Sequence, residues 1–287
     1  MPRAGLPAAV RLGIRRRWRH GVKTALAALG AVWLITEVGT FVSPDLKSFL
    51  EHHNFWYGTA VCLIALCAFF WSVIELRSIQ FLVPSTGSKI LIKFGDLFAE
   101  QDHLAFGINE YFDGAIGQRV SIESIHGQFI QKVYSGDENR FRNAIDQALV
   151  GKPGVQVVRS PPPDLAYPMG TTAVLDVGNR KAFLFVLTRT DLVTAKASTD
   201  VPSYWQALTG ALEAIYHHSN HRPVAFPLIG NGPSSLNLPA QHLLRLLTLK
   251  LVHFGRDKGL PSQVTIVLPP ACFEHVDLRE IERDWKS

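Results

Sequence analysis

Two apolar windows near the N-terminus constrain this chain more than any other feature. Residues 24–44 contain one acidic and no basic residue, and residues 55–74 contain no charged residue. Each window is close to the roughly 20 residues with which a helix crosses a bilayer. The first window is too long for a cleaved signal peptide, and the second follows it closely. We therefore predict a hairpin of two retained transmembrane helices over 24–75.

Glu37 is the only charged residue in the two windows. A carboxylate at mid-bilayer costs on the order of a few kcal/mol unless it is paired, protonated or near the interface. One interpretation places Glu37 at the interface, at the outer end of a tilted helix. The other gives it a role in lining a pore or in pairing helices. The sequence leaves both open.

The formal net charge of +5 is concentrated at the N-terminus. Seven basic residues precede the first acidic residue, so 22 basic residues remain against 24 acidic residues after Lys23. Binding to nucleic acid needs a basic face on the folded domain, so we expect no nucleic-acid partner. The basic arm, residues 1–23, instead follows the positive-inside rule. It predicts a cytoplasmic N-terminus, an external loop at 44–54, and a cytoplasmic location for the rest of the chain.

The segment after the hairpin divides into a connector and one large domain. Residues 76–88 contain proline, glycine and serine, which are typical of a linker, and residues 89–287 form the domain. In the domain, β-branched and aromatic runs alternate with runs of helical periodicity, which predicts an α/β fold with a mixed, largely parallel sheet. The expected strands are 89–95, 103–109, 155–160, 171–177, 181–188, 223–229 and 263–269, and the expected helices are 121–134, 137–149, 201–218, 239–259 and 273–286.

One loop of this domain has the composition of a phosphate-binding loop. The apolar run at 223–229 leads into Gly230 and Gly232, where missing Cβ atoms let backbone N–H groups approach an anion. Ser234 and Ser235 add hydroxyl donors, and the helix expected after Pro239 adds its positive end. A tight connection between strand and helix is the alternative. The sequence has no P-loop motif and only a near match to G-x-G-x-x-G.

No metal site is expected. His217 and His221 have the i, i+4 spacing of helical ligands, but the glutamate of the zincin motif is missing. Histidines also suit the negative end of a helix dipole. The cysteines, Cys62, Cys67 and Cys272, form neither a zinc ligand set nor a disulfide framework.

Residues 82–287 resemble a macro domain, the α/β module that binds ADP-ribose and its derivatives. The segment ILIKFGDLF at 90–98 is similar to the opening strand of that family, which ends in Gly-Asp. The segment at 171–191 is also similar, and VAFPLIGNGPSSL at 224–236 is similar to its late Pro-x-x-Gly-x-Gly loop. The resemblance implies a macro-like α/β/α sandwich with a mixed sheet, an ADP-ribose derivative as ligand, and no further cofactor.

The resemblance also implies which residues contact the ligand. Asp96 would accept a hydrogen bond from the adenine amino group, although an Asp that caps a turn is the alternative. Asn109 would lie near the distal ribose. The pyrophosphate would be held by one loop and an opposing wall, in which Arg119 offers charge-assisted hydrogen bonds. The loop is Gly230, Asn231, Gly232, Ser234 and Ser235, and the wall is Gly117, Gln118, Arg119 and Ser121.

The same comparison bears on catalysis. Members that remove ADP-ribose carry a run of glycines before Val-Asp-Gly-Ala-Ile, a flexible loop that positions a water molecule. Residues 113–116 of this chain are Asp-Gly-Ala-Ile, but Tyr111 and Phe112 stand in place of the glycines. We therefore expect a binding pocket without catalytic residues, and a protein that is not an enzyme.

The whole chain, two spans followed by a divergent macro domain, resembles the membrane effector of Thoeris antiphage defence systems. In that family a companion TIR-domain enzyme makes an ADP-ribose conjugate, histidine-ADP-ribose, and the effector binds it and disrupts the membrane. The resemblance implies this role in a bacterial inner membrane, with the N-terminus and the macro domain in the cytoplasm. Two helices alone cannot enclose a conduit, so we expect a homo-oligomer. The alternatives are a membrane-tethered ADP-ribosyl hydrolase and a scaffold that recruits ADP-ribosylated proteins.

Overall fold

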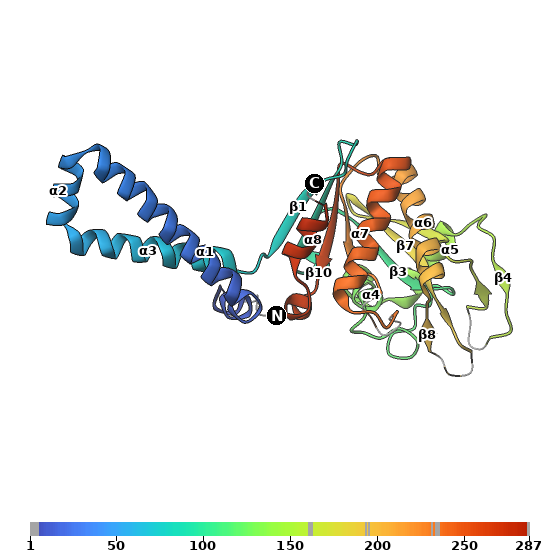
Figure 1. Cartoon of the computed structure of the whole chain (residues 1–287). Coiled ribbons are helices and arrows are strands. Elements are labelled where there is room, and N and C mark those ends of the chain that lie inside the picture. Colours follow the sequence, from blue (N-terminus) through green and yellow to red (C-terminus); the bar gives the residue numbers. More distant parts are fainter. Residues whose placement is uncertain are drawn as a thin grey trace. The chain divides into compact units, whose positions relative to one another are not determined.

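The computed structural model describes residues 6–159, 163–192, 194, 196–230, 232 and 236–285. The chain forms two compact units, Met1–Leu76 and Arg77–Ser287. Figure 1 shows the first unit in blue shades and the second in the remaining colours.

The first unit is helical. It consists of α1 (Leu6–Val42), α2 (Pro44–His52) and α3 (Asn54–Val73), and α1 and α3 pack against each other. A Cβ atom on Gly21 would lie 2.7 Å from side-chain atoms of Phe69 and Val73, so this close packing depends on glycine. The segments Ala9–Val42 and Asn54–Val73 are long and apolar enough to cross a membrane. Glu37 is exposed within this unit, which leaves both interpretations of its role open.

The basic arm is part of α1 rather than a separate segment. Helical structure begins at Leu6 and is interrupted at Arg17, whose φ of −132° and ψ of 18° are not helical. At this kink the Arg16 and Arg17 guanidinium groups lie 3.6 and 4.0 Å from the Glu75 carboxylate, whose side chain is only 3% exposed. These ion pairs connect the kink in α1 to the residues that follow α3.

The second unit is built on one mixed sheet. Five parallel strands form its centre, and an antiparallel strand pairs with each end of this group. A two-residue strand, β8 (Ala197–Ser198), continues the pairing at the end of β7, and a separate hairpin is formed by β4 (Val155–Gln156) and β5 (Leu165–Ala166). The order across the sheet is β1 (Ser78–Leu82), β2 (Lys89–Phe94), β10 (Gln263–Leu268), β9 (Val224–Pro227), β3 (His103–Asn109), β7 (Arg180–Thr190) and β6 (Thr172–Val177).

Helices cover the sheet, with α6 and α7 packed together on one side (Figure 1). On the other side, α4 and α5 contribute Phe129 and Phe141 to a fully buried cluster with Leu104 and Phe106 of β3. This alternation of layers confirms the predicted α/β sandwich with a mixed sheet. The helices are α4 (Ile125–Tyr134), α5 (Glu138–Ala148), α6 (Val201–His218), α7 (Ala240–Asp257) and α8 (Leu278–Trp285), with short 3₁₀ turns at Leu97–Ala99 and Pro270–Glu274.

Several predicted boundaries differ from the structure. The connector predicted over 76–88 is wrong in part, because it contains β1, whose Ile79 and Phe81 are buried in alternation with exposed neighbours. The strand predicted at 155–160 is only two residues long. The helix predicted from 121 begins at Ile125, because the Ser124 hydroxyl caps it by accepting from the Gly127 N–H. The last helix begins at Leu278, after a 3₁₀ turn.

Candidate ligand-binding site

The predicted site residues come together because their strands run parallel. The carboxyl ends of β2, β9 and β3 lie at the same edge of the sheet, where ligands of open α/β sheets collect. Asp96 follows β2, Asn109 ends β3, and Gly230 and Gly232 follow β9. The structure therefore places these four residues at one edge of the sheet. Contact of each residue with a ligand stays a prediction.

Asp96 has the turn-capping role that was its alternative. Its carboxylate accepts a hydrogen bond from the Phe98 N–H at 3.0 Å and begins a 3₁₀ turn. The side chain is 60% exposed, and the Lys132 ammonium lies 3.5 Å from its other oxygen. This carboxylate caps one turn at the strand end while its second oxygen faces the surface.

Two residues of the glycine loop after β9 are described, Gly230 and Gly232. Gly230 has a φ of +86°, which favours glycine, and a Cβ there would lie 3.2 Å from Leu243. A Cβ on Gly232 would meet no atom of the described residues within 4 Å. The helix that follows, α7, begins after Pro239, which supplies no side-chain cap. The predicted residues Asn231, Ser234 and Ser235 lie outside the described residues.

A buried tyrosine lies below this loop. The ring of Tyr204, on α6, is 3.6 Å from the position of a Cβ on Gly230. Its hydroxyl group has no hydrogen-bond partner among the residues that the structure describes, and burial raises its pKa. Sequence analysis did not identify Tyr204, because its aromatic ring fits the apolar periodicity of α6.

The predicted opposing wall is a tight turn. The Arg119 and Val120 N–H groups both donate to the Ala115 carbonyl, and Gly117 adopts a φ of +81°. Gly117, Gln118 and Ser121 are exposed. The Arg119 guanidinium lies 3.5 Å from the Asp113 carboxylate, so its charge is partly compensated within the protein.

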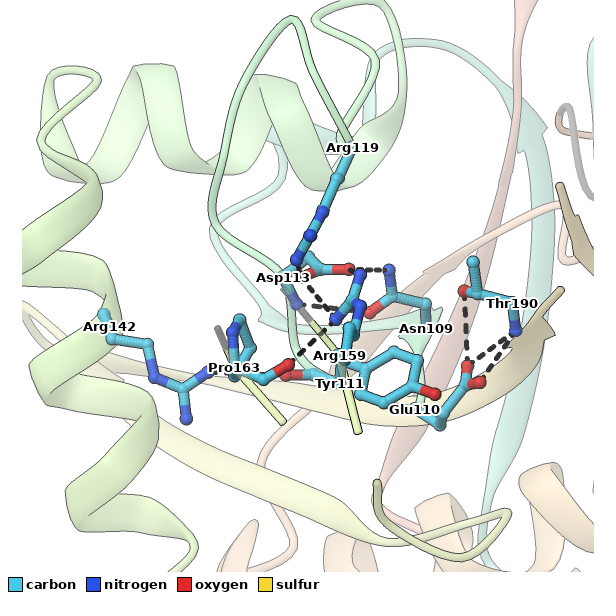
Figure 2. Close-up of polar contacts among 9 residues, drawn as sticks. All are labelled: Asn109, Glu110, Tyr111, Asp113, Arg119, Arg142, Arg159, Pro163 and Thr190. Atoms are coloured by element: carbon cyan, nitrogen blue, oxygen red, sulfur yellow. Dashed lines mark hydrogen bonds and ion pairs between the residues drawn. The ribbon is translucent and has the colours of Figure 1, made fainter. Parts of the chain in front are cut away.

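Asp113 is the centre of a buried polar network (Figure 2). Its side chain is 1% exposed and accepts two hydrogen bonds from Arg159, at 3.0 and 2.6 Å. The Asn109 amide donates to the same carboxylate at 2.8 Å, and the Asp113 N–H donates to the Asn109 side-chain oxygen at 3.2 Å. The side chain of Asn109 thus holds the start of the β3–α4 loop. This structural role was not predicted, and the predicted contact of Asn109 with a ribose stays a prediction.

Arg159 comes from a distant segment and is held on several sides. Its guanidinium also donates to the Pro163 carbonyl at 3.1 Å and lies 3.8 Å from the centre of the Tyr111 ring. Figure 2 shows it between Tyr111 and Asp113. Sequence analysis missed Arg159, because 46 residues separate it from Asp113 and no motif surrounds it.

Two more ionisable groups are buried near this network. Glu110 accepts hydrogen bonds from the Thr190 N–H at 2.8 and 2.9 Å, and burial raises its pKa. Burial lowers the pKa of His126 to about 4, against a smaller opposing effect of Asp113. The His126 Nε2 atom has no hydrogen-bond partner in the part of the chain that the structure describes. This imidazole is therefore neutral at pH 7.

His217 and His221, which have helical spacing in the sequence, do not lie on one helix face. The helix ends at His218, and His221 has a φ of +57° in the turn beyond it. Within the described ranges, no group of three His, Cys, Asp or Glu side chains is arranged to hold a metal ion.

Comparison with known proteins identifies the family. No curated protein matches the chain. A mutant of the Oceanobacillus iheyensis macrodomain with ADPR has 12% identity and a TM-score of 0.50, over 73% of this chain and 100% of that chain, which shows a shared fold. The same macrodomain with ADP has 12% identity and a TM-score of 0.49, over 72% of this chain and 97% of that chain. The model of the family "Thoeris protein ThsA, Macro domain" matches residues 90–269, more than half of the chain, and the chain therefore belongs to this family.

Proposed function

We propose that this protein is a membrane effector of antiphage immunity that senses an ADP-ribose-derived signal. The macro domain binds the signal, which is histidine-ADP-ribose made by a TIR-domain enzyme, and the protein then oligomerises and disrupts the membrane. The observation that carries the proposal is the glycine loop after β9, at the ligand edge of a domain of the Thoeris ThsA macro family.

The geometry of the loop supports an anionic ligand. A Cβ on Gly232 would meet no atom of the described part of the chain within 4 Å, and the first turn of α7 follows without a side-chain cap. Exposed N–H groups at a helix N-terminus attract phosphate. The mutant Oceanobacillus iheyensis macrodomain that shares this fold contains ADPR, which supports the same class of ligand.

The state of Asp113 supports binding without hydrolysis. A general base must accept a proton from water, but this carboxylate is buried and already accepts hydrogen bonds from Arg159 and Asn109. We therefore propose a sensor and not an enzyme. The membrane-tethered hydrolase and the recruiting scaffold are the competing functions.

The two apolar helices support the proposed disruption of the membrane. They have the length and composition of spans, and the ion pairs of Glu75 attach the kink in α1 to the last residues of this unit. Because a two-helix hairpin encloses no conduit, disruption requires several copies.

The test is calorimetry on the full chain in nanodiscs with histidine-ADP-ribose, ADP-ribose and NAD, followed by chromatography of the ligand. We expect histidine-ADP-ribose to bind and to be recovered intact. Gly232→Glu places a carboxylate beside the proposed pyrophosphate position and should abolish binding. Gly87→Glu is the matched control, because a Cβ on this exposed glycine also meets no atom within 4 Å.

The outcomes separate the candidate functions. A cleaved ligand would identify a hydrolase, and no binding to any of the three compounds would refute the ligand class. Release of a dye from liposomes that contain the protein, only when the ligand is added, tests disruption of the membrane. Binding without release of dye would favour the scaffold.

A further inference from the structure

The last strand of the sheet, β6, has an open hydrogen-bonding edge. Among the described strands it pairs with β7 alone, with Thr172 opposite Phe185 and Val174 opposite Phe183. The neighbouring residue Thr171 accepts a hydrogen bond from the Val186 N–H at 3.0 Å. Because hydrogen-bonded and non-hydrogen-bonded pairs alternate in an antiparallel ladder, the main-chain N–H and C=O groups of Thr172 and Val174 point away from β7.

A cleft of about 530 Å³ runs along this open edge. Thr172 and Val174 line it, together with small residues of the flanking helices, Ala148, Gly210 and Ala214. Small side chains beside a strand let the main chain of another segment come within hydrogen-bonding distance of it. None of the described residues of the predicted ligand site lines this cleft.

The packing beside the cleft depends on glycine. A Cβ on Gly210 would lie 2.2 Å from the Gly170 carbonyl oxygen, so α6 approaches the start of β6 at this point without a side chain between them. At the start of β6 the edge is consequently flanked by helix backbone, and the longer side chains that line the cleft lie farther along it.

The rim of the cleft carries one cation without a carboxylate partner among the described residues. Lys152 lines it, and no carboxylate among the described residues lies within 4 Å of its ammonium group. Glu213, on the opposite wall, is paired with Lys258 at 2.9 Å, so its charge is compensated. Burial lowers the pKa of His218, and the charges of Lys181, His217 and Lys152 lower it further, so this ring adds no positive charge at neutral pH. Lys152 is therefore the group that favours an acidic partner.

We propose that β6 docks an extended, acidic peptide segment of a partner protein, which adds to the sheet as a further strand. The main-chain groups of Thr172 and Val174 supply the hydrogen bonds, as in other cases of strand addition. Carboxylate side chains of the partner meet the Lys152 ammonium group at the rim. This surface lies apart from the glycine loop and does not depend on the proposed ligand.

The test uses a fluorescein-labelled peptide, Glu-Val-Glu-Val-Glu-Val, and the full chain in detergent micelles. Fluorescence anisotropy should show binding, and the corresponding Lys-Val peptide should bind at least about tenfold more weakly. Val174→Pro removes one N–H from the open edge without removing a hydrogen bond to β7, and it should weaken binding about tenfold. Val174→Ala keeps this N–H and is the matched control.

Hydrogen exchange provides a second measurement. Amides of residues 171–177 should exchange more slowly when the acidic peptide is bound, whereas amides of residues 230–239 should not change. Each variant must keep the far-UV circular dichroism spectrum and the melting temperature of the parent protein, which separates loss of docking from loss of the fold.

Three results would overturn the proposal. The first is that the acidic peptide fails to bind at millimolar concentration. The second is that it binds to the Val174→Pro variant as well as to the Val174→Ala variant. The third is that sedimentation shows that the protein self-associates and that Val174→Pro alone abolishes this association, in which case a second copy occupies the edge.

Discussion

Removal of Arg159 should destabilise the macro-domain unit strongly. The substitution Arg159→Met takes away both donors that bind the Asp113 carboxylate, at 3.0 and 2.6 Å, while Asp113 stays 1% exposed. Loss of one partner of a buried ion pair costs about 3–5 kcal/mol. We expect about 3 kcal/mol, because Asn109 still donates at 2.8 Å and Arg119 lies 3.5 Å away.

This free energy predicts a measurable change in melting temperature. For a unit of this size, each kcal/mol lowers Tm by about 2–4 °C, so Arg159→Met should lower it by about 6–12 °C. The assay is scanning fluorimetry of the full chain in detergent, supported by urea unfolding. Arg142→Met is the control, since Arg142 pairs with Asp146 at the surface and donates one long hydrogen bond, 3.4 Å, to the Tyr111 carbonyl. Surface ion pairs contribute about 0–1 kcal/mol, and Asp113 keeps all its partners in this variant.

A double-mutant cycle isolates the charge. Asp113→Asn removes the buried charge, so adding it to Arg159→Met should restore at least half of the lost stability. Equal losses for Arg159→Met and Arg142→Met would refute the reasoning. Strictly additive effects of the two substitutions at positions 159 and 113 would also refute it.

Two further predictions concern the same unit. The pKa of His126 is about 4 in the folded protein, below its ordinary 6.5, so protonation of the unfolded chain should reduce stability as the pH falls from about 6.5 to about 4. Urea unfolding should show a loss of about 2 kcal/mol between pH 7 and pH 5 that His126→Phe lacks, and an equal loss in both proteins would contradict this. A Cβ on Gly107 would lie 2.4 Å from Leu187, so Gly107→Ala should cost about 1–3 kcal/mol in the same assay. Gly95→Ala, where the nearest atom is 3.7 Å away, should change stability little, and similar losses at both glycines would contradict the argument.

Much of the fold was predictable because local patterns and tertiary packing agree. The strand predicted at 103–109 is β3. The helix predicted from 137 is α5, and Asp137 caps its N-terminus, a position at which aspartate is favoured. The strand β1 was missed because it is short and lies beside proline and glycine residues. Its alternation of Ile79 and Phe81 with polar residues was present in the sequence, but so short a pattern does not separate an edge strand from a linker.

The site was predictable only where its residues follow strands directly. Asp96, Asn109 and Gly230 each lie at or just beyond a strand end, so the parallel order of the sheet brings them to one edge. The partner of Asp113 was not predictable in this way. Arg159 follows a two-residue strand, and its position is fixed by contacts with Tyr111 and Asp113 that no local pattern encodes.

The missed contact is also the one that bears most on binding versus hydrolysis. For Asp113 to accept a proton from water, Arg159 would first have to release at least one of its two hydrogen bonds. If the free energy of this release approaches the 3 kcal/mol expected for the loss of Arg159, it slows any reaction through Asp113 by about two orders of magnitude. A separate set of hydrogen bonds, between Asn109 and Asp113, fixes the start of the β3–α4 loop. Both sets support the proposed sensor, because the bonds from Arg159 oppose proton transfer to Asp113 and the bonds with Asn109 hold the loop in one conformation before a ligand binds.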